Sequence, residues 1–259
     1  MLNYPIPIIV FICLSGMCIG SFLNVCIYRI PDGKSVVYPP SSCPNCGYQI
    51  RWYDNIPLLS YLWLKAKCRQ CNIPISFRYP MIEVMTGLSA LCVLFRFGLG
   101  IESLIYFIFT ATLIVITFID IDHQIIPDII SLPGIPIFFL ASFWIPTMTW
   151  KDSLIGIVSG GGSLWLVAEI YMLIAKKEGM GGGDIKLLAM MGGLIGWKGV
   201  LFTIFFSSAI GTFAGLAIVI HTRKNLKLAM PFGPFLAIGA MMYIFWGEKI
   251  IRWYLHLLR

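Results

Sequence analysis

The chain has 259 residues, of which 58% are apolar and only 12% are charged. An average soluble domain carries about a quarter charged residues. This composition therefore excludes a soluble globule, whose surface it could not cover with polar groups. The net charge of +7 comes largely from one loop, so we interpret it as membrane topology and expect no nucleic-acid partner. Membrane lipid is the first partner that the sequence predicts.

Eight hydrophobic segments follow one another along the chain, each a candidate for a membrane span of about 20 apolar residues. They cover residues 5–27, 81–97, 102–120, 129–147, 153–175, 185–197, 199–220 and 230–247. The second and sixth are short, so we expect tilted helices or added non-helical backbone that lines a cavity. The predicted fold is an all-α polytopic membrane protein with about eight transmembrane helices. We divide it into a first helix in residues 1–28, a polar loop at 29–80 and a multi-span domain at 81–259.

The loop at 29–80 carries seven of the 19 Lys and Arg residues, which marks it as cytoplasmic. Alternation of the spans then places the turn after Asp120, residues 176–186 and residues 223–227 on the same side. A further stretch, residues 249–259, is expected to lie in the headgroup layer of the membrane.

Two Cys-x-x-Cys pairs lie in this loop, 21 residues apart. Their members are Cys43, Cys46, Cys68 and Cys71. Each pair can present two thiolates from one turn, and two such turns complete a tetrahedral zinc site. Gly47 and Asn72, just past the pairs, suit tight turns. Disulfides are the alternative, which a reducing cytoplasm disfavours. Four thiolates leave no open position, so we predict a structural zinc that folds the loop.

A carboxylate at membrane depth is costly and therefore a functional candidate, and five of the 12 acidic residues matter for this reason. They are Asp120, Asp122, Asp128, Glu169 and Asp184. We expect Asp128 to be the N-cap of the following helix. Asp122 is explained equally well as a functional carboxylate or as a solvated residue at a helix end. Glu169 is expected to face the interior of the bundle with a hydrogen-bond partner.

Asp184 follows the glycine-rich run at 179–183, which permits unusual backbone angles and close approach of a substrate strand. A phosphate-binding loop is a weak alternative, because no Lys-Ser/Thr pair follows. The topology puts Asp120 and Asp184 at one membrane face, where two carboxylates can act as base and acid on a peptide bond. The sequence has no Gly-x-Ser-x-Gly and no His-Glu-x-x-His motif. The aspartyl pair is therefore the best catalytic candidate.

Several stretches resemble the bacterial type IV prepilin peptidase family of GxGD aspartyl proteases. They are Gly20 to Pro31, Arg78 to Gly87, Phe118 to Asp128, Lys177 to Met190 and Pro231 to Ala237. The resemblance implies that Asp120 and Asp184 are catalytic in a bacterial cytoplasmic (inner) membrane. It implies cleavage of the leader peptide of type IV prepilins or pseudopilins, in a pilus, secretion or DNA-uptake apparatus. It also implies methylation of the new N-terminus with S-adenosylmethionine, since zinc-bearing members of the family carry this second activity.

The chain departs from the family at Ala66, where a glycine associated with methylation is common. Glu83 and the segment at 54–61 match family positions without an assigned role. Three other functions remain open from the sequence. One is a different GxGD intramembrane protease, which gives no account of the zinc loop. The second is a transporter or channel, which Glu169 and the broken sixth segment would suit. The third is a zinc-ribbon membrane scaffold, which gives no reason for Asp184 in its glycine run.

Overall fold

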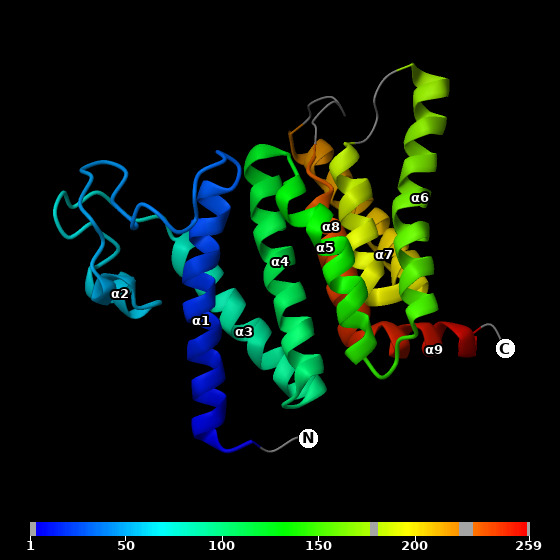
Figure 1. Cartoon of the computed structure of the whole chain (residues 1–259). Helices are drawn as coiled ribbons and strands as arrows, with labels where there is room; N and C mark the ends of the chain where they lie inside the picture. The colour runs from blue at the N-terminus through cyan, green and yellow to red at the C-terminus, as the bar shows by residue number, and fades with distance from the viewer. Residues whose placement is uncertain (1–3, 177–180, 223–229, 258–259) are drawn as a thin grey trace. The chain divides into compact units, whose positions relative to one another are not determined.

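The computed structural model describes residues 4–176, 181–222 and 230–257 (Figure 1). These residues contain no β-strand, only two isolated bridges, so the all-α prediction is confirmed. The chain divides into two compact units, Met1–Val115 and Ile116–Arg259. The border falls inside helix α4 (Ile101–His123), most of which is buried.

Unit 1 consists of long helices and a polar loop. Helix α1 (Ile6–Arg29) packs against α3 (Arg78–Phe97), and the loop between them holds a short 3₁₀ turn η1 (Trp52–Asn55) and α2 (Leu59–Trp63). Glycines allow the two long helices to approach closely. A Cβ atom at Gly20 would lie only 2.8 Å from the Cα atom of Glu83. Small residues at helix contacts are typical of membrane bundles, where close packing replaces the hydrophobic effect as the force between helices.

Among the described residues, unit 2 continues from the end of α4 through five further helices. They are α5 (Asp128–Ala141) with the 3₁₀ turn η2 (Ser142–Trp144), α6 (Trp150–Ala175), α7 (Gly182–Thr222), α8 (Gly233–Met242) and α9 (Glu248–Leu257), the last two joined by the π-helical turn η3 (Tyr243–Gly247). Helices α5, α6 and α8 all pack against α7. Gly156 on α6 and Gly192 on α7 meet so closely that a Cβ atom on either would overlap the other's backbone.

In the part of the chain that the structure describes, six helical stretches are long and apolar enough to cross a membrane, and Asp128–Trp144 is a shorter apolar helix. The protein is therefore a multi-pass membrane protein. The stretch Gly182–Ile220 has 39 residues, almost twice what one span needs. Gly196 has non-helical backbone angles, φ 66° and ψ 178°, and so interrupts α7. This interruption lies close to the predicted border between the sixth and seventh segments. The total of eight spans stays a prediction.

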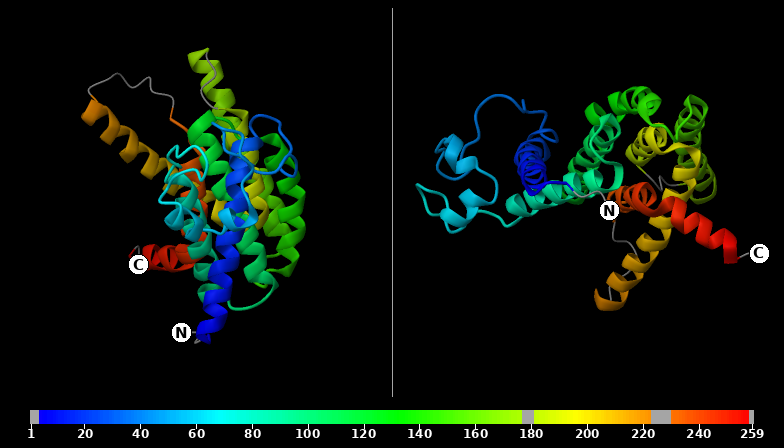
Figure 2. Two further views of the ribbon diagram at one scale, coloured as in Figure 1. Left: turned by 90° about the vertical axis from the view of Figure 1, so that its left-hand side faces the viewer. Right: turned by 90° about the horizontal axis from the view of Figure 1, so that it is seen from below.

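Helix α9 runs across the direction of α8 in two views of the molecule (Figures 1 and 2). Its Trp253, Tyr254 and Leu257 side chains are exposed. This arrangement agrees with the expected interfacial stretch at 249–259, because aromatic side chains favour the headgroup layer. The loop at 223–227, which the topology places with the basic inner face, lies outside the described residues.

Candidate functional site

One end of unit 2 gathers the end of α4 and the first turns of α5, α7 and α8 (Figure 1). Asp120, in the last turn of α4, is only 5% exposed. Its Oδ2 atom accepts a hydrogen bond of 2.9 Å from the backbone N–H of Gly233, the first residue of α8. A helix N-terminus presents unpaired N–H groups and a partial positive charge, so it stabilises a carboxylate.

Asp184 lies in the first turn of α7 and is half-buried. Its helix begins beside the segment that follows α4, at the same end of unit 2 as Asp120 (Figure 1). Gly183 makes this approach possible, because a Cβ atom there would lie 2.9 Å from the Cβ atom of Ile126, in the segment after α4. The structure thus brings Asp120 and Asp184 to the same place from helices that are remote in the chain. The preceding residues 177–180, part of the same sequence motif, lie outside the described residues.

The prediction for Asp128 was wrong. Pro127 is the N-cap of α5, and no side chain caps this helix end. Asp128 is instead the first helical residue, and both its carboxylate oxygens accept hydrogen bonds of 2.8 Å from the Lys186 ammonium group on α7. The cap fails because Asp128 already has helical backbone angles, which point its side chain away from the free N–H groups. The ion pair ties α5 to the turn of α7 that carries Asp184.

Asp122 and Glu169 differ from the aspartyl pair in their surroundings. Asp122 is exposed, as expected for the opposite side of a helix end from Asp120. Glu169 is half-buried on α6. Its carboxylate has no hydrogen bond to another described residue, so the expected partner is not found in that part of the chain.

Sequence reasoning missed the roles of Gly233 and Lys186. Gly233 belongs to a motif noted in the sequence, and Pro234 beside it is a typical first-turn residue of a helix. That signal predicts the start of α8. The carboxylate that its N–H would meet, however, lies 113 residues away in the chain.

The four loop cysteines form a compact cluster in unit 1. Their Sγ atoms all lie within 4.8 Å of one another, with Cys43 to Cys71 at 3.8 Å and Cys46 to Cys68 at 4.0 Å. All eight cysteines of the chain are free, which contradicts the disulfide alternative. A tetrahedral zinc with Zn–S bonds of about 2.3 Å sets its sulfurs roughly 3.8 Å apart. The four thiols therefore fit one zinc ion.

Two similar turns build the cluster. The Cys43 N–H donates to the Tyr48 carbonyl and the Cys68 N–H donates to the Ile73 carbonyl, each at 2.9 Å. Gly47 and Asn72 have φ values of 69° and 56°, which confirms the tight turns expected there.

The thiols of the cluster differ in acidity. A hydrogen bond from the Ile73 N–H lowers the pKa of Cys71 to about 6. At Cys46 the Tyr48 N–H favours the thiolate, but burial and the neighbouring thiols outweigh it and raise the pKa to about 11. Four thiolates are mutually repulsive without a cation, so binding of a metal ion would release the remaining protons.

Two polar contacts connect the loop further. The Arg69 guanidinium, inside the second Cys-x-x-Cys pair, binds both carboxylate oxygens of Asp54, and this raises the Arg69 pKa. The Leu58 N–H donates to the buried Glu83 carboxylate at 2.8 Å. The structure thereby links Glu83 to the 54–61 segment, two features that the sequence singled out without a role.

The departure at Ala66 has a structural consequence. Its φ is 58°, the left-handed region that glycine adopts more easily than alanine. The Ala66 carbonyl accepts a hydrogen bond of 2.7 Å from the Ile75 N–H, which holds it in this conformation at the entrance to the second cysteine turn.

Comparison with known proteins covers most of the chain. Residues 6–97 match the bacterial peptidase A24 N-terminal domain, and residues 107–216 match the type IV leader peptidase family. A protein of Aeromonas hydrophila called prepilin leader peptidase/N-methyltransferase is 36% identical over 93% of this chain and 92% of its own length. The chain belongs to the type IV leader peptidase family.

Two other proteins with the same name match this chain over nearly their whole length. The protein of Pseudomonas aeruginosa is 36% identical over 98% of this chain and 95% of its own length. The protein of Legionella pneumophila is 32% identical over 98% and 96%, respectively. No solved structure matches the chain. Membership in a family named for its peptidases favours a protease over the transporter that the sequence left open.

Proposed function

We propose that this protein is a membrane aspartyl endopeptidase that removes the leader peptide of type IV prepilins or pseudopilins. We also propose that it methylates the new N-terminus with S-adenosylmethionine, as the names of its relatives suggest. The bacterial inner membrane is the proposed location. What supports the peptidase proposal is the hydrogen bond from the Gly233 N–H to Asp120, together with the start of α7, which carries Asp184, packed against the segment after α4.

The geometry suggests different roles for the two carboxyl groups. Asp120 receives the Gly233 N–H and faces the positive end of α8, which stabilises a negative charge. We therefore assign the ionised general base to Asp120 and the proton to Asp184. Asp120 would take a proton from a water molecule as that water attacks the scissile carbonyl carbon. Asp184 would donate its proton to the carbonyl oxygen, and proton transfer to the leaving nitrogen would then complete the cleavage.

The cysteine cluster has a structural role in this proposal. Zinc bound by Cys43, Cys46, Cys68 and Cys71 would fold the loop and take no part in hydrolysis, because four thiolates leave no place for water. S-adenosylmethionine, when bound, supplies the activated methyl group. The chain must hold it within reach of the amine that cleavage exposes.

The test is mass spectrometry of the N-terminus of a co-expressed prepilin. Asp120→Asn and Asp184→Asn should each abolish cleavage while the protein remains in the membrane. Asp122→Asn is the matched control, since it makes the same chemical change on the exposed side of the same helix end. It should leave cleavage near the wild-type level. Normal processing by Asp120→Asn would show that the dyad is wrongly assigned.

A further inference from the structure

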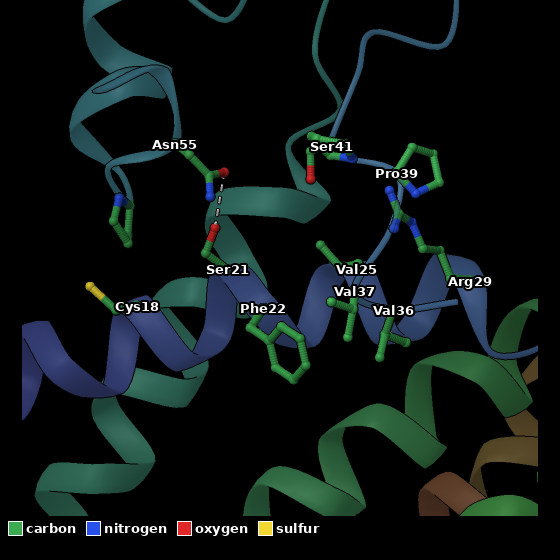
Figure 3. Close-up of a pocket in the computed structure, with 12 residues that line it drawn as sticks. Cys18, Ser21, Phe22, Val25, Arg29, Val36, Val37, Pro39, Ser41 and Asn55 are labelled. Atoms are coloured by element: carbon green, nitrogen blue, oxygen red, sulfur yellow. Dashed lines mark hydrogen bonds between the residues drawn. The ribbon is translucent and has the colours of Figure 1, made fainter. Parts of the chain in front are cut away.

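A pocket of about 390 Å³ lies where the last turns of α1 meet the polar loop, entirely within unit 1 (Figure 3). This volume falls in the range of roughly 300–1,000 Å³ that small-molecule and cofactor sites occupy. Its lining residues have no part in the hydrolysis proposed above. Any ligand of this pocket is therefore distinct from the scissile peptide bond.

The lining combines apolar walls with a few polar groups, as small-molecule sites do. Phe22 on α1 and Val37 and Pro57 in the loop supply apolar surface. The Ser21 hydroxyl donates a hydrogen bond of 3.3 Å to the side-chain carbonyl oxygen of Asn55, and both residues line the pocket (Figure 3). A ligand that fits must present an extended apolar face together with hydroxyl or amide groups.

Arg29 gives the pocket its charge. Its guanidinium group donates from Nη1 to the Ser35 carbonyl at 2.9 Å. It has no ion pair with a carboxylate anywhere in the described part of the chain. Since a guanidinium group has five N–H donors, most remain for an anionic ligand, and a carboxylate matches their geometry in a bidentate pair. The lining contains no acidic side chain that would compete for this cation.

We propose that this pocket binds S-adenosylmethionine. Arg29 holds the carboxylate of the methionyl part, Ser21 and Asn55 bind the ribose hydroxyls, and Phe22 with the loop wall packs against the adenine. The inference rests on the proposed methyltransferase activity and gives it a site. The location suits the reaction, because the apolar part of α1 ends beside this pocket. A substrate whose helix lies in the bilayer would present its new N-terminus at the same depth.

The test measures binding of S-adenosylhomocysteine to the purified full-length protein by calorimetry. Val37→Trp fills the pocket from an exposed position, so it should weaken binding at least tenfold. Arg29→Gln removes the charged donor and should raise the Kd about tenfold to a hundredfold. Ile50→Trp is the matched control, because it makes a similar enlargement in the same loop outside the pocket lining. Its Kd should equal that of the wild type. Zinc content, measured on every variant, reports whether the loop remains folded.

The outcomes separate this inference from the proposed function. If the wild type binds the probe and both pocket variants bind equally well with normal zinc content, the pocket is wrongly assigned while methyl transfer stands. If the wild type neither binds the probe nor methylates a cleaved prepilin, the methyltransferase proposal fails and this inference with it. A pocket that holds phospholipid gives a third pattern. Native mass spectrometry would then find a co-purified phosphatidylglycerol that Val37→Trp loses, with probe binding unchanged, and this would also overturn the inference.

Discussion

Replacing Gly233 by alanine tests the contact on which the proposed catalytic geometry depends. A Cβ atom at this position would lie 2.7 Å from Oδ2 and 3.3 Å from Cγ of Asp120. Ordinary van der Waals contact begins near 3.4 Å. The carboxylate oxygen would therefore have to move away by about 0.7 Å. Such a shift matters for catalysis, because a misplacement of about 1 Å can slow an enzymatic reaction about 100-fold. Asp120 has a short side chain and is buried, so it has little room for this movement.

The expected loss of activity follows from the hydrogen bond that the methyl group would break. The Gly233 N–H donates to a carboxylate at 2.9 Å, and bonds of this charge-assisted kind contribute about 1.5–3 kcal/mol. If the contact supports the transition state, its loss should slow cleavage about tenfold to a hundredfold. Gly233→Ala should therefore be much slower than wild type but still active, unlike Asp120→Asn.

The assay is the rate of prepilin processing by purified protein, followed by mass spectrometry. Gly162→Ala on α6 is the matched control, because a Cβ atom there has no neighbour within 4 Å, and its rate should stay near wild type. Zinc content and membrane insertion should be unchanged in both variants. A wild-type rate for Gly233→Ala would refute the view that the start of α8 positions the reacting carboxylate.

Three further predictions concern the loop and the ion pair on α7. Ala66→Gly should stabilise the loop by up to about 1 kcal/mol, because glycine adopts the left-handed backbone conformation without the steric strain of alanine. Lys67→Gly is the control, at a position without positive φ, and should destabilise the loop. The resistance of bound zinc to a chelator measures both effects. Lys186→Gln should lower the free energy of unfolding by no more than about 1 kcal/mol, since the ion pair is exposed; a larger loss in chemical denaturation would contradict this. Cys46→Ser should lose the bound zinc in metal analysis, whereas Cys92→Ser on α3 should keep about one zinc per chain.

Composition and hydrophobic pattern were enough to predict that this protein lies in a bilayer and where most of its helices run. Few charges and long apolar stretches leave only helices in a bilayer, because lipid cannot satisfy backbone hydrogen bonds. The Cys-x-x-Cys spacing also predicted a four-thiol cluster, since two residues between thiols let one turn present both. Asp120 and Asp184 were recognisable for a local reason: a carboxylate beside a membrane span is costly and rarely kept without a use.

The groups that contact those carboxylates could not be predicted from the sequence, because they come from distant parts of the chain. The hydrogen bond from Gly233 to Asp120 joins residues 113 positions apart, and the pair of Lys186 with Asp128 joins residues 58 positions apart. No periodicity or local propensity specifies such contacts, which depend on how closely helices pack at glycines such as Gly183. The failed N-cap at Asp128 has the same origin. Local preference favoured a bond to its own helix, but packing against α7 offered its carboxylate a cation instead.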